Sequence, residues 1–504
     1  MVSISKKRPS ASKQLTANVI GRAWVLLSNV VFVPVYLNLL GIQNFGVVAL
    51  FIAVIGLIAF LDMGLSPTLA RELNDQKHTH AEKLDLLHTY EIIYATLVCV
   101  IVAVALLLPT EAYQLFVSAE DIARPEVAES IHLVFAAAAV LMLFNFYIAG
   151  ILGIEQHVKG NIVLLSAGVI RSALVIAPLW FYPTPYVFLI WQLVTALAFT
   201  FIARILLYRL IGASENDRPP AFNRTLLIRN VAFSGSLFLV SIAAAVNTQI
   251  DKIFIGKLSG LEALASYSLV STFSQILVFA VTPITITLLP RLVRIVTSGD
   301  DEGVRNLFGL AYRFVAAIVA TGVGSMIWFG PYLISLWTSG KLSPVAVSDY
   351  STPLILGYGL LALSMVPHNV AVAYKNMRGS MLISLSVFVT IPSFSIFIGL
   401  FGLQGAAGTW LALQAVTAPF YLFWVDRTLL HLGGVFRMLV STVIIPFSVA
   451  MAVCYAAYQL LGEASELGRN LSVIALAVAI TFLCNLLLTL RPSDRVYLLQ
   501  AIAR

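Results

Sequence analysis

Three arginines lie inside long apolar stretches of the sequence, where a charge is costly. They are Arg22, Arg171 and Arg313. A charged side chain at the centre of a membrane helix costs at least about 2.5–3.5 kcal/mol, so it must pair or reach water. A guanidinium also donates two parallel charge-assisted hydrogen bonds to a phosphate. The arginines therefore predict a hydrated cavity that binds an anionic group, although Arg22 has the alternative of snorkelling to the interface.

Neutral polar side chains accompany these arginines in the apolar stretches. Asn29 lies about two turns from Arg22 on roughly the same helical face. Such groups commonly hydrogen-bond neighbouring helices, so interhelical bonding is the first expectation and substrate contact the alternative. The other members of this set are Asn145, Asn161, Gln275, His368 and Asn369.

Two charged clusters mark the ends of apolar stretches. Asp62 ends one stretch, where the sequence predicts either an ion pair with Arg71 or a gate on the cytoplasmic side. Asp251 and Lys252 follow the polar residues 247–249. This pair predicts either an outer vestibule or a plain interfacial ion pair.

Catalytic signatures are absent from the sequence. It contains no P-loop, no G-x-S-x-G nucleophile elbow and no H-E-x-x-H metal motif. The three cysteines fall in apolar runs without the spacing of a metal site or a disulfide framework. We therefore expect a protein that is not an enzyme and holds no metal or cofactor. Nucleic acid is not an expected partner, because the Lys and Arg do not cluster on a soluble segment.

The elements that carry these residues are membrane-spanning helices. The chain has 504 residues, of which 60% are hydrophobic and 11% charged, with a mean hydropathy of +0.93. A soluble domain has about 25% charged residues. Continuous apolar runs of about 20 residues indicate helices, because barrel strands alternate apolar and polar residues. The fold class is therefore an all-α polytopic membrane protein.

Fourteen spans are predicted from the apolar runs. The first is an uncleaved span, because its run is too long for a signal peptide and no cleavage site ends it. The spans cover about 15–40, 45–66, 88–109, 131–154, 161–181, 185–207, 229–250, 262–289, 306–330, 351–373, 380–401, 404–425, 436–461 and 470–490.

The sidedness of this arrangement comes from Lys and Arg, which favour cytoplasmic loops. With fourteen spans, nearly all loop Lys and Arg fall on the side of both termini, which is predicted to be cytoplasmic. The few on the other side are Arg124, Lys252, Lys257, Lys341 and Arg469. The acidic outer segment 110–130 is expected to be a solvated surface loop.

A charged, proline-bearing segment divides the chain, and the opening hairpin recurs after it. Gly41 and Gly260 occupy matching places in the two copies, as do Arg71 and Arg291 to within one residue. Two halves of the same orientation form a parallel repeat. The predicted parts are an N-terminal lobe at 1–213, a cytoplasmic linker at 214–229, a C-terminal lobe at 230–430, and two further spans with a short tail at 431–504.

Two segments resemble the Wzx-type polysaccharide flippases, which export O-antigen and exopolysaccharide repeat units and belong to the multidrug/oligosaccharidyl-lipid/polysaccharide superfamily. The first segment carries Asn18, Pro34-x-Tyr36, Leu40-Gly41, Gly46, Leu61-Asp62-x-Gly64-Leu65 and Ala70-Arg71-Glu72. The second carries Asn247 and Asp251-Lys252-Ile253-x-Ile255-Gly256-x-Leu258.

The resemblance implies two six-helix lobes of the MATE type around a cavity that opens alternately to each side. It implies as cargo an oligosaccharide on undecaprenyl pyrophosphate, moved across the bacterial inner membrane, with cavity arginines on the pyrophosphate. Arg22 best fits a first-helix cationic residue of this kind. Proton or sodium coupling, and a polysaccharide polymerase and chain-length regulator as partners, belong to the same expectation.

Other functions stay open at this point. Lipid II flippases carry cavity arginines in their second and eighth helices, which this chain lacks there. The drug and cation antiporters use a buried acid in the first helix, which span 15–40 also lacks. A membrane enzyme would be expected to show a large outer catalytic loop or an intramembrane His/Asp set. A scaffold would not need Arg171 at mid-membrane.

Overall fold

The structure is a computed structural model, and its described part is built of helices. It describes residues 28, 30–62, 64–74, 78–212, 218–224, 242, 245–462, 466–492 and 494, and no strand occurs among them. Arg22 and Asn29 lie outside these residues. The helical membrane class is therefore confirmed.

The backbone contacts divide the chain into two compact units, Met1–Ala265 (unit 1) and Ser266–Arg504 (unit 2). The division falls inside one helix of the second repeat copy. Most of the predicted linker at 214–229 lies outside the described residues, so the lobe boundaries stay a prediction.

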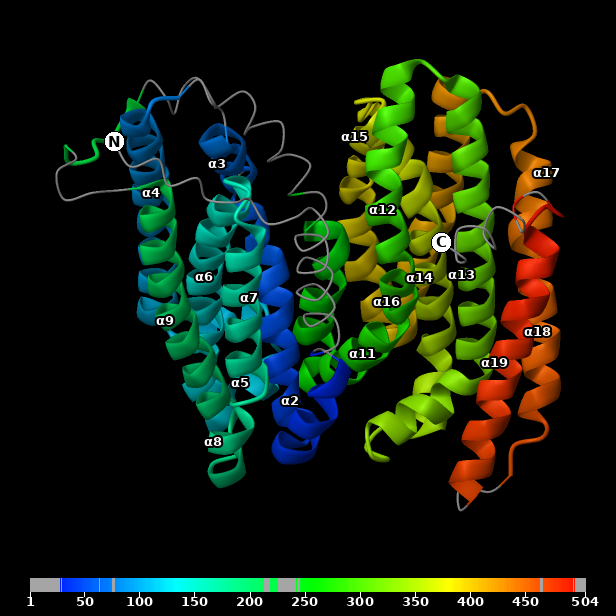
Figure 1. The fold of residues 1–504 in the computed structure, drawn as a ribbon. Helices are drawn as coiled ribbons and strands as arrows, with labels where there is room; N and C mark the ends of the chain where they lie inside the picture. Colours follow the sequence, from blue (N-terminus) through cyan, green and yellow to red (C-terminus); the bar gives the residue numbers. More distant parts are fainter. Residues whose placement is uncertain are drawn as a thin grey trace. The chain divides into compact units, whose positions relative to one another are not determined.

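Unit 1 is organised around α6. This helix is the most buried span of the unit, and it packs against α2, α3, α4 and α9 (Figure 1). Its run Ala136–Ala139 is fully enclosed, because small residues let neighbouring backbones approach closely. The helices are α2 Val33–Ile58, η1 Ala59–Asp62, α3 Leu65–Asn74, α4 His80–Leu107, η2 Thr110–Leu115, α5 Ala119–Ile122, α6 Pro125–Gly153, α7 His157–Ser172, α8 Ile176–Phe181 and α9 Pro185–Ile211.

Unit 2 is organised around α13 and α14, which pack on each other and are the most buried spans there. Helix α11 crosses the boundary between the units. The helices from α11 onward are α11 Gly260–Ser274, α12 Ile276–Ser298, α13 Asp301–Trp337, α14 Pro344–Ala373, α15 Arg378–Ser384, α16 Val387–Val425, the π-helix η3 Asp426–Leu430, α17 Val435–Leu439, the π-helix η4 Val440–Ile444, α18 Ile445–Tyr458 and α19 Leu467–Thr489.

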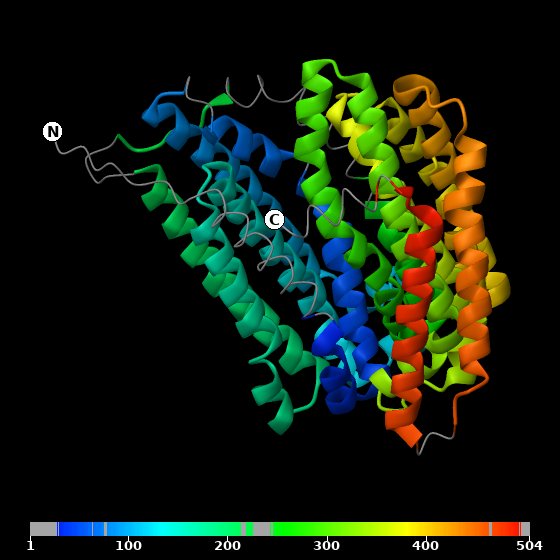
Figure 2. The ribbon, with the colours of Figure 1, turned by 45° about the vertical axis from the view of Figure 1, so that its right-hand side comes forward.

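The last two helices, α18 and α19, lie side by side and pack on α13 (Figures 1 and 2). Gly324 of α13 leaves no room for a Cβ atom, which would lie 2.6 Å from that of Ala450. Buried polar groups tie the three helices together: Asn485 Nδ2 donates to Thr321 Oγ1 at 3.0 Å, and Cys454 Sγ lies 3.6 Å from Ser325 Oγ. The C-terminal pair is therefore an integral part of unit 2.

Eleven helical ranges in the described part are long and apolar enough to cross a membrane. One of them, Arg378–Leu430, has 53 residues, or about 80 Å of helix against a hydrocarbon core of roughly 30 Å. It turns back at Gly402, which has φ 56° and ψ −133°, so it contains the two predicted spans 380–401 and 404–425. Spans 15–40 and 229–250 lie largely outside the described residues, and the count of fourteen stays a prediction.

The two copies of the opening hairpin meet in unit 1. The matching glycines Gly41 and Gly260 both have positive φ, 77° and 86°, a conformation that favours glycine. Gln43 Nε2 donates to Glu262 at 3.3 Å, and these residues are separated by the same number of positions as the two glycines. Equivalent places of the two copies therefore lie together.

The outer segment 110–130 has most of its acids exposed, as its acidity predicted, but it is folded and not a loop. It folds into η2, α5 and the start of α6, and Tyr113 is buried. Asp121 accepts a hydrogen bond from the Leu261 backbone N–H at 2.7 Å, and Arg124 donates to Asn44 at 2.7 Å. The segment thus joins the hairpin turns of both copies, because its polar groups satisfy backbone and side-chain atoms there.

Replacing Gly46 tests the close contact between the two copies of the hairpin. A Cβ atom at Gly46 would lie 2.3 Å from the Leu261 carbonyl oxygen, so Gly46→Ala should lower the apparent melting temperature of the purified protein. Gly408→Ala is the control, since nothing lies within 4 Å of its added Cβ. It should be neutral or stabilising by up to about 1 kcal/mol. Equal effects of the two substitutions would contradict the close packing at Gly46.

Candidate functional site

Arg171 lies at a break in the middle of a membrane span. The span His157–Phe181 consists of α7, which ends at Ser172, and α8, which begins at Ile176. Pro178 contributes to the break because a proline ring clashes with the carbonyl four residues earlier, here that of Leu174. The sequence prediction treated 161–181 as one continuous helix, and Pro178 was the signal for the break.

Side chains from two other helices satisfy the carbonyls that the break frees. The hydroxyl of Tyr36, on α2, donates to the Ser172 carbonyl. On α9, Trp191 Nε1 donates to the Ile170 carbonyl at 3.0 Å, and Gln192 Nε2 donates to the Arg171 carbonyl at 3.3 Å. In hydrocarbon such groups must find partners within the protein. The break is therefore stabilised by specific hydrogen bonds within unit 1.

The guanidinium of Arg171 has no acid within ion-pair distance among the described residues. Arg171 is half-buried and lies in the last turn of α7, where the helix dipole favours a cation. A charge at this depth needs water or an anionic group. The arrangement therefore leaves Arg171 available to an anion.

Two acids within spans are fully occupied with structural contacts. Glu91 of α4 accepts hydrogen bonds from Tyr147 of α6 at 2.7 Å and from Arg204 and Tyr208 of α9. Asp62 accepts from Ser66 and Tyr94. The predicted ion pair between Asp62 and Arg71 is wrong, since Arg71 Nη2 lies 2.9 Å from Glu72 instead.

The Glu91 cluster was missed by sequence reasoning, because Arg204 was counted only as a loop charge. The signal was Glu91 itself, an acid inside an apolar run. The N-terminal part of α4 carries a second missed contact: Asp85 pairs with Arg218 and accepts from the Ala221 backbone N–H at 2.9 Å. The described part of the linker therefore docks on α4.

The neutral polar residues are mostly engaged in contacts between helices. Asn369 Nδ2 donates to the Thr285 carbonyl at 2.6 Å, His368 Nδ1 lies 3.1 Å from the Tyr421 hydroxyl, and Gln275 Nε2 lies 3.4 Å from that of Tyr358. Asn161 bonds within its own helix, to His157. Asn145 is exposed, whereas most of its neighbours on α6 are buried. Their predicted part in substrate binding stays a prediction.

Asp251 and Lys252 are buried, and Lys252 Nζ lies 3.5 Å from Asp251 Oδ1 and 2.9 Å from the Thr248 carbonyl. A solvated outer vestibule does not fit such enclosure. The alternative expectation, an ion pair, is the one that the contacts support.

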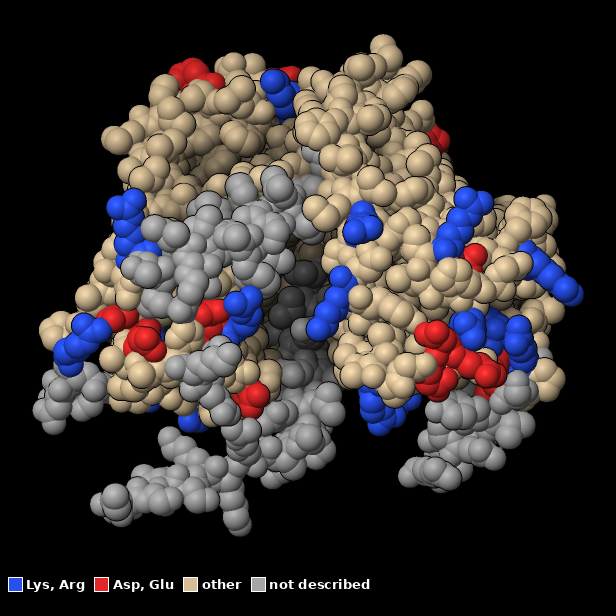
Figure 3. Space-filling model, turned by 90° about the horizontal axis from the view of Figure 1, so that it is seen from above, with Lys and Arg blue, Asp and Glu red and all other residues tan. Residues whose placement is uncertain are grey.

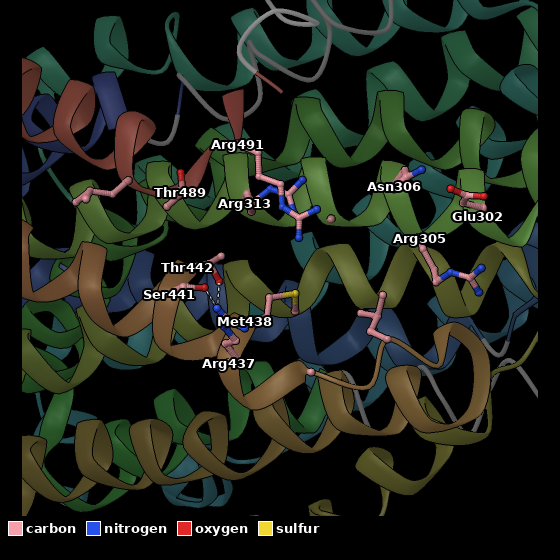
Figure 4. A pocket seen from close by; sticks show the side chains of 14 residues that line it. Glu302, Arg305, Asn306, Arg313, Arg437, Met438, Ser441, Thr442, Thr489 and Arg491 are labelled. Carbon is pink, nitrogen blue, oxygen red and sulfur yellow. Dashed lines mark hydrogen bonds between the residues drawn. The ribbon is translucent and has the colours of Figure 1, made fainter. Parts of the chain in front are cut away.

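Arg313, the third predicted arginine, lines a pocket of about 870 Å³ in unit 2, which we call the arginine pocket (Figure 4). The pocket is formed by the N-terminal part of α13, the segment around α17 and η4, and the end of α19. Its lining residues are Glu302, Arg305, Asn306, Gly309, Arg313, Leu432, Gly434, Arg437, Met438, Ser441, Thr442, Leu488, Thr489 and Arg491.

Four arginines therefore meet from three separate segments of the chain. The sequence prediction placed Arg305, Arg437 and Arg491 among the loop charges and did not bring them together with Arg313. Figure 3 shows Lys and Arg side chains interspersed with Asp and Glu on the face that it draws. Because the pocket depends on how α13 packs with α18 and α19, no local pattern could predict it.

No cluster of three or more His, Cys, Asp or Glu in the described part of the chain could hold a metal ion. The chemistry that both Arg171 and the arginine pocket offer is the binding of an anion.

Comparisons with known proteins agree with this architecture. Residues 15–296 match the polysaccharide biosynthesis protein family, and residues 236–397 match the MatE family. A search of curated proteins found no match. Both family matches fit the predicted resemblance.

Solved structures with this fold include the lipid II flippase MurJ in an inward closed conformation, with 14% identity, a TM-score of 0.65, and coverage of 94% of this chain and 98% of that chain. An inward-facing MATE family multidrug resistance transporter of the MOP superfamily has 16% identity, a TM-score of 0.63, and coverage of 82% and 97%. The Vibrio cholerae MATE transporter VcmN has 17% identity, a TM-score of 0.57, and coverage of 83% and 96%. The predicted MATE-like fold is therefore confirmed.

Glu72 offers a pH test of the contacts at the end of α3. Its carboxylate accepts hydrogen bonds from His78 at 2.8 Å and from Arg71 at 3.1 Å. Burial raises the pKa of Glu72, but the hydrogen bond from His78 and the charge of Arg71 outweigh it, so the pKa is lowered. A lowered pKa means that the ionised carboxylate stabilises the fold above the ordinary Glu pKa of about 4.3, and that this contribution is lost as the pH falls.

Glu72→Gln should therefore lower the apparent melting temperature at pH 7, and the difference from wild type should shrink as the pH approaches about 4. Thermal unfolding of the detergent-solubilised protein over this range measures it. Glu129→Gln, at an exposed residue, is the control and should show no such trend. A difference for Glu72→Gln that does not change with pH would contradict the stabilising role of the ionised group.

Proposed function

This chain belongs to the polysaccharide biosynthesis protein family of the multidrug/oligosaccharidyl-lipid/polysaccharide superfamily, and from this premise we propose that its cargo is an oligosaccharide linked to undecaprenyl pyrophosphate. We propose that the protein is a multi-pass membrane transporter of the flippase type. We propose that it moves the cargo across the bacterial inner membrane by alternating access, with both termini in the cytoplasm.

The observation that carries this proposal is the guanidinium of Arg171, which faces no acid at mid-span among the described residues. A pyrophosphate supplies the anion that such a group requires, and its oxygens match the planar fork of an arginine. Arg22 is proposed as a further contact of this kind. Arg313, which the sequence also offered, is paired with Asp494 in unit 2 and belongs to the arginine pocket there.

A flippase solves a definite energetic problem for this cargo. A sugar head group cannot cross hydrocarbon, since each unsatisfied polar group costs several kcal/mol. A hydrated path lined by cations removes this cost, while the lipid tail stays in the bilayer. Proton or sodium entry, or consumption of the product by a polysaccharide polymerase and a chain-length regulator, would drive the transport.

A small-molecule antiporter is the second candidate, because residues 236–397 match the MatE family. A lipid II flippase is a third, because the MurJ fold covers 94% of this chain. The three candidates differ in what accumulates when the protein is absent: lipid-linked repeat units, a drug, or lipid II.

The test is glycan export in a host that lacks the gene, complemented at matched expression by wild type or by variants. Arg171→Ala should trap lipid-linked repeat units inside and lower surface glycan at least about tenfold, because a charge-assisted hydrogen bond contributes about 1.5–3 kcal/mol. Arg171→Lys keeps the charge and should retain part of the export. Arg209→Ala is the control, because Arg209 is exposed at the end of α9.

Three outcomes would count against the proposal in different ways. If Arg171→Ala exports glycan normally, the proposed cargo is unaffected, but Arg171 does not belong to its binding site. If wild type changes drug tolerance but leaves surface glycan untouched, the antiporter replaces the flippase. If deletion instead accumulates lipid II, the lipid II flippase does.

A further inference from the structure

The arginine pocket carries more positive charge than its acids neutralise. Arg313 is paired with Asp494, whereas Arg305, Arg437 and Arg491 have no acid within 4.0 Å among the described residues. In Figure 4 the side chains of Arg313 and Arg491 come together, Arg437 lies across from them, and Arg305 lies toward one end. Like charges gathered around a cavity repel one another, so an anion between them is favoured.

Asp494 shows which kind of group this surface accepts. One carboxylate oxygen, Oδ2, accepts hydrogen bonds from Arg313 Nε at 2.8 Å and from the Arg491 backbone N–H at 3.0 Å, and it also lies 2.8 Å from Arg313 Nη2. An oxygen anion held by a guanidinium and a backbone N–H is equally the environment of a bound phosphate. The carboxylate of Asp494 therefore fills one part of a site that could also hold an external anion.

The opposite wall offers charge rather than hydroxyl donors. Arg437 lies on α17, and the π-helix η4 that follows carries Ser441 and Thr442. Both hydroxyls donate to the Met438 carbonyl, at 3.2 and 2.7 Å, so they are not free to donate to a ligand. Short π-helical segments occur frequently at functional sites. Recognition here would rest on the guanidinium groups.

The depth of the pocket points to a lipid as the carrier of the anion. Its walls are the first turns of α13, the start of the span Val435–Tyr458 and the last turn of α19. The ends of membrane spans are where head groups are expected. Leu488, which lines the pocket, is 49% exposed, and Ile444, in the same π-helix as Ser441 and Thr442, is 53% exposed. A phosphate attached to a lipid reaches this place without leaving the membrane.

We propose that the arginine pocket binds the phosphate-bearing head group of a membrane lipid, and that Asp494 competes with this group for Arg313. The site lies wholly in unit 2 and does not depend on which cargo the protein transports. The two proposals therefore fail separately, because this one is tested by binding and the other by export.

The experiment measures lipid binding to the purified full-length protein. Short-chain phosphatidylglycerol is the probe, zwitterionic short-chain phosphatidylcholine is the comparison, and native mass spectrometry counts the bound lipid. Wild type should bind one phosphatidylglycerol at least tenfold more tightly than phosphatidylcholine, and inorganic pyrophosphate should displace it. The combined variant Arg305→Ala, Arg437→Ala, Arg491→Ala should lose at least tenfold in affinity.

A control variant removes the same number of charges elsewhere in unit 2. Arg291, Arg294 and Arg378 are exposed and lie outside the pocket, so replacing them with alanine should leave binding unchanged. The lysine version of the pocket variant keeps the charge and should retain part of the affinity, which guards against a variant that merely fails to fold.

Asp494→Asn supplies a test in the opposite direction. Removing the internal carboxylate frees Arg313, so binding of phosphatidylglycerol should become tighter, while the apparent melting temperature without lipid should fall. Weaker binding of phosphatidylglycerol in this variant would contradict the proposal that Asp494 competes with the lipid for Arg313.

Three further results would overturn the site. Equal losses of affinity in the pocket and control variants would mean that the general positive charge of the surface, and not the pocket, attracts the lipid. Unchanged binding in the pocket variant would mean that the arginines hold no lipid. Binding of pyrophosphate without binding of phosphatidylglycerol would mean that the pocket takes a soluble anion and not a lipid head group.

Discussion

The absence of water from hydrocarbon is the constraint on which this structure depends. Every carbonyl that leaves the helical ladder must find a donor in the protein. The break after Arg171 meets this requirement with side chains of α2 and α9, which donate to three successive carbonyls. Because the donors come from other helices, the break is fixed by tertiary packing. It keeps a cation at mid-span, in a segment that would otherwise continue as an apolar helix.

The same constraint separates the charges into two kinds. Glu91, Asp62 and Asp251 each lie against a donor or a cation. Asp251 and Lys252 form a buried ion pair, and removing one partner of such a pair is expected to destabilise the fold by about 3–5 kcal/mol. Arg171 and three arginines of the pocket have no acid of this kind in the described part of the chain. Structural charges are thus neutralised locally, and the remaining cations mark places for an anion.

Much of the fold could be predicted from the sequence, because the length of an apolar run is a property of a single segment. The positive φ at Gly41 and Gly260 agrees with the repeat that their matching positions indicated. The pairing of Asp62 with Arg71 was wrong, because Asp62 accepts a hydrogen bond from Tyr94 of α4 while Arg71 pairs with its neighbour Glu72. The acidic outer segment is exposed as predicted, but its contacts with both hairpin turns were not predicted, because the partners are distant in sequence.

The arginine pocket shows most clearly why sites of this kind are hidden in a sequence. Its arginines are distributed over α13, α17 and the residues after α19, and only the packing of the C-terminal pair on α13 brings them together. That packing rests on Gly324 against Ala450 and on the bond between Asn485 and Thr321, none of which carries charge. The two spans beyond the repeated halves therefore do more than extend the fold. They supply Arg437 and Arg491 to one cavity, and they give unit 2 an anion site that the repeat alone would lack.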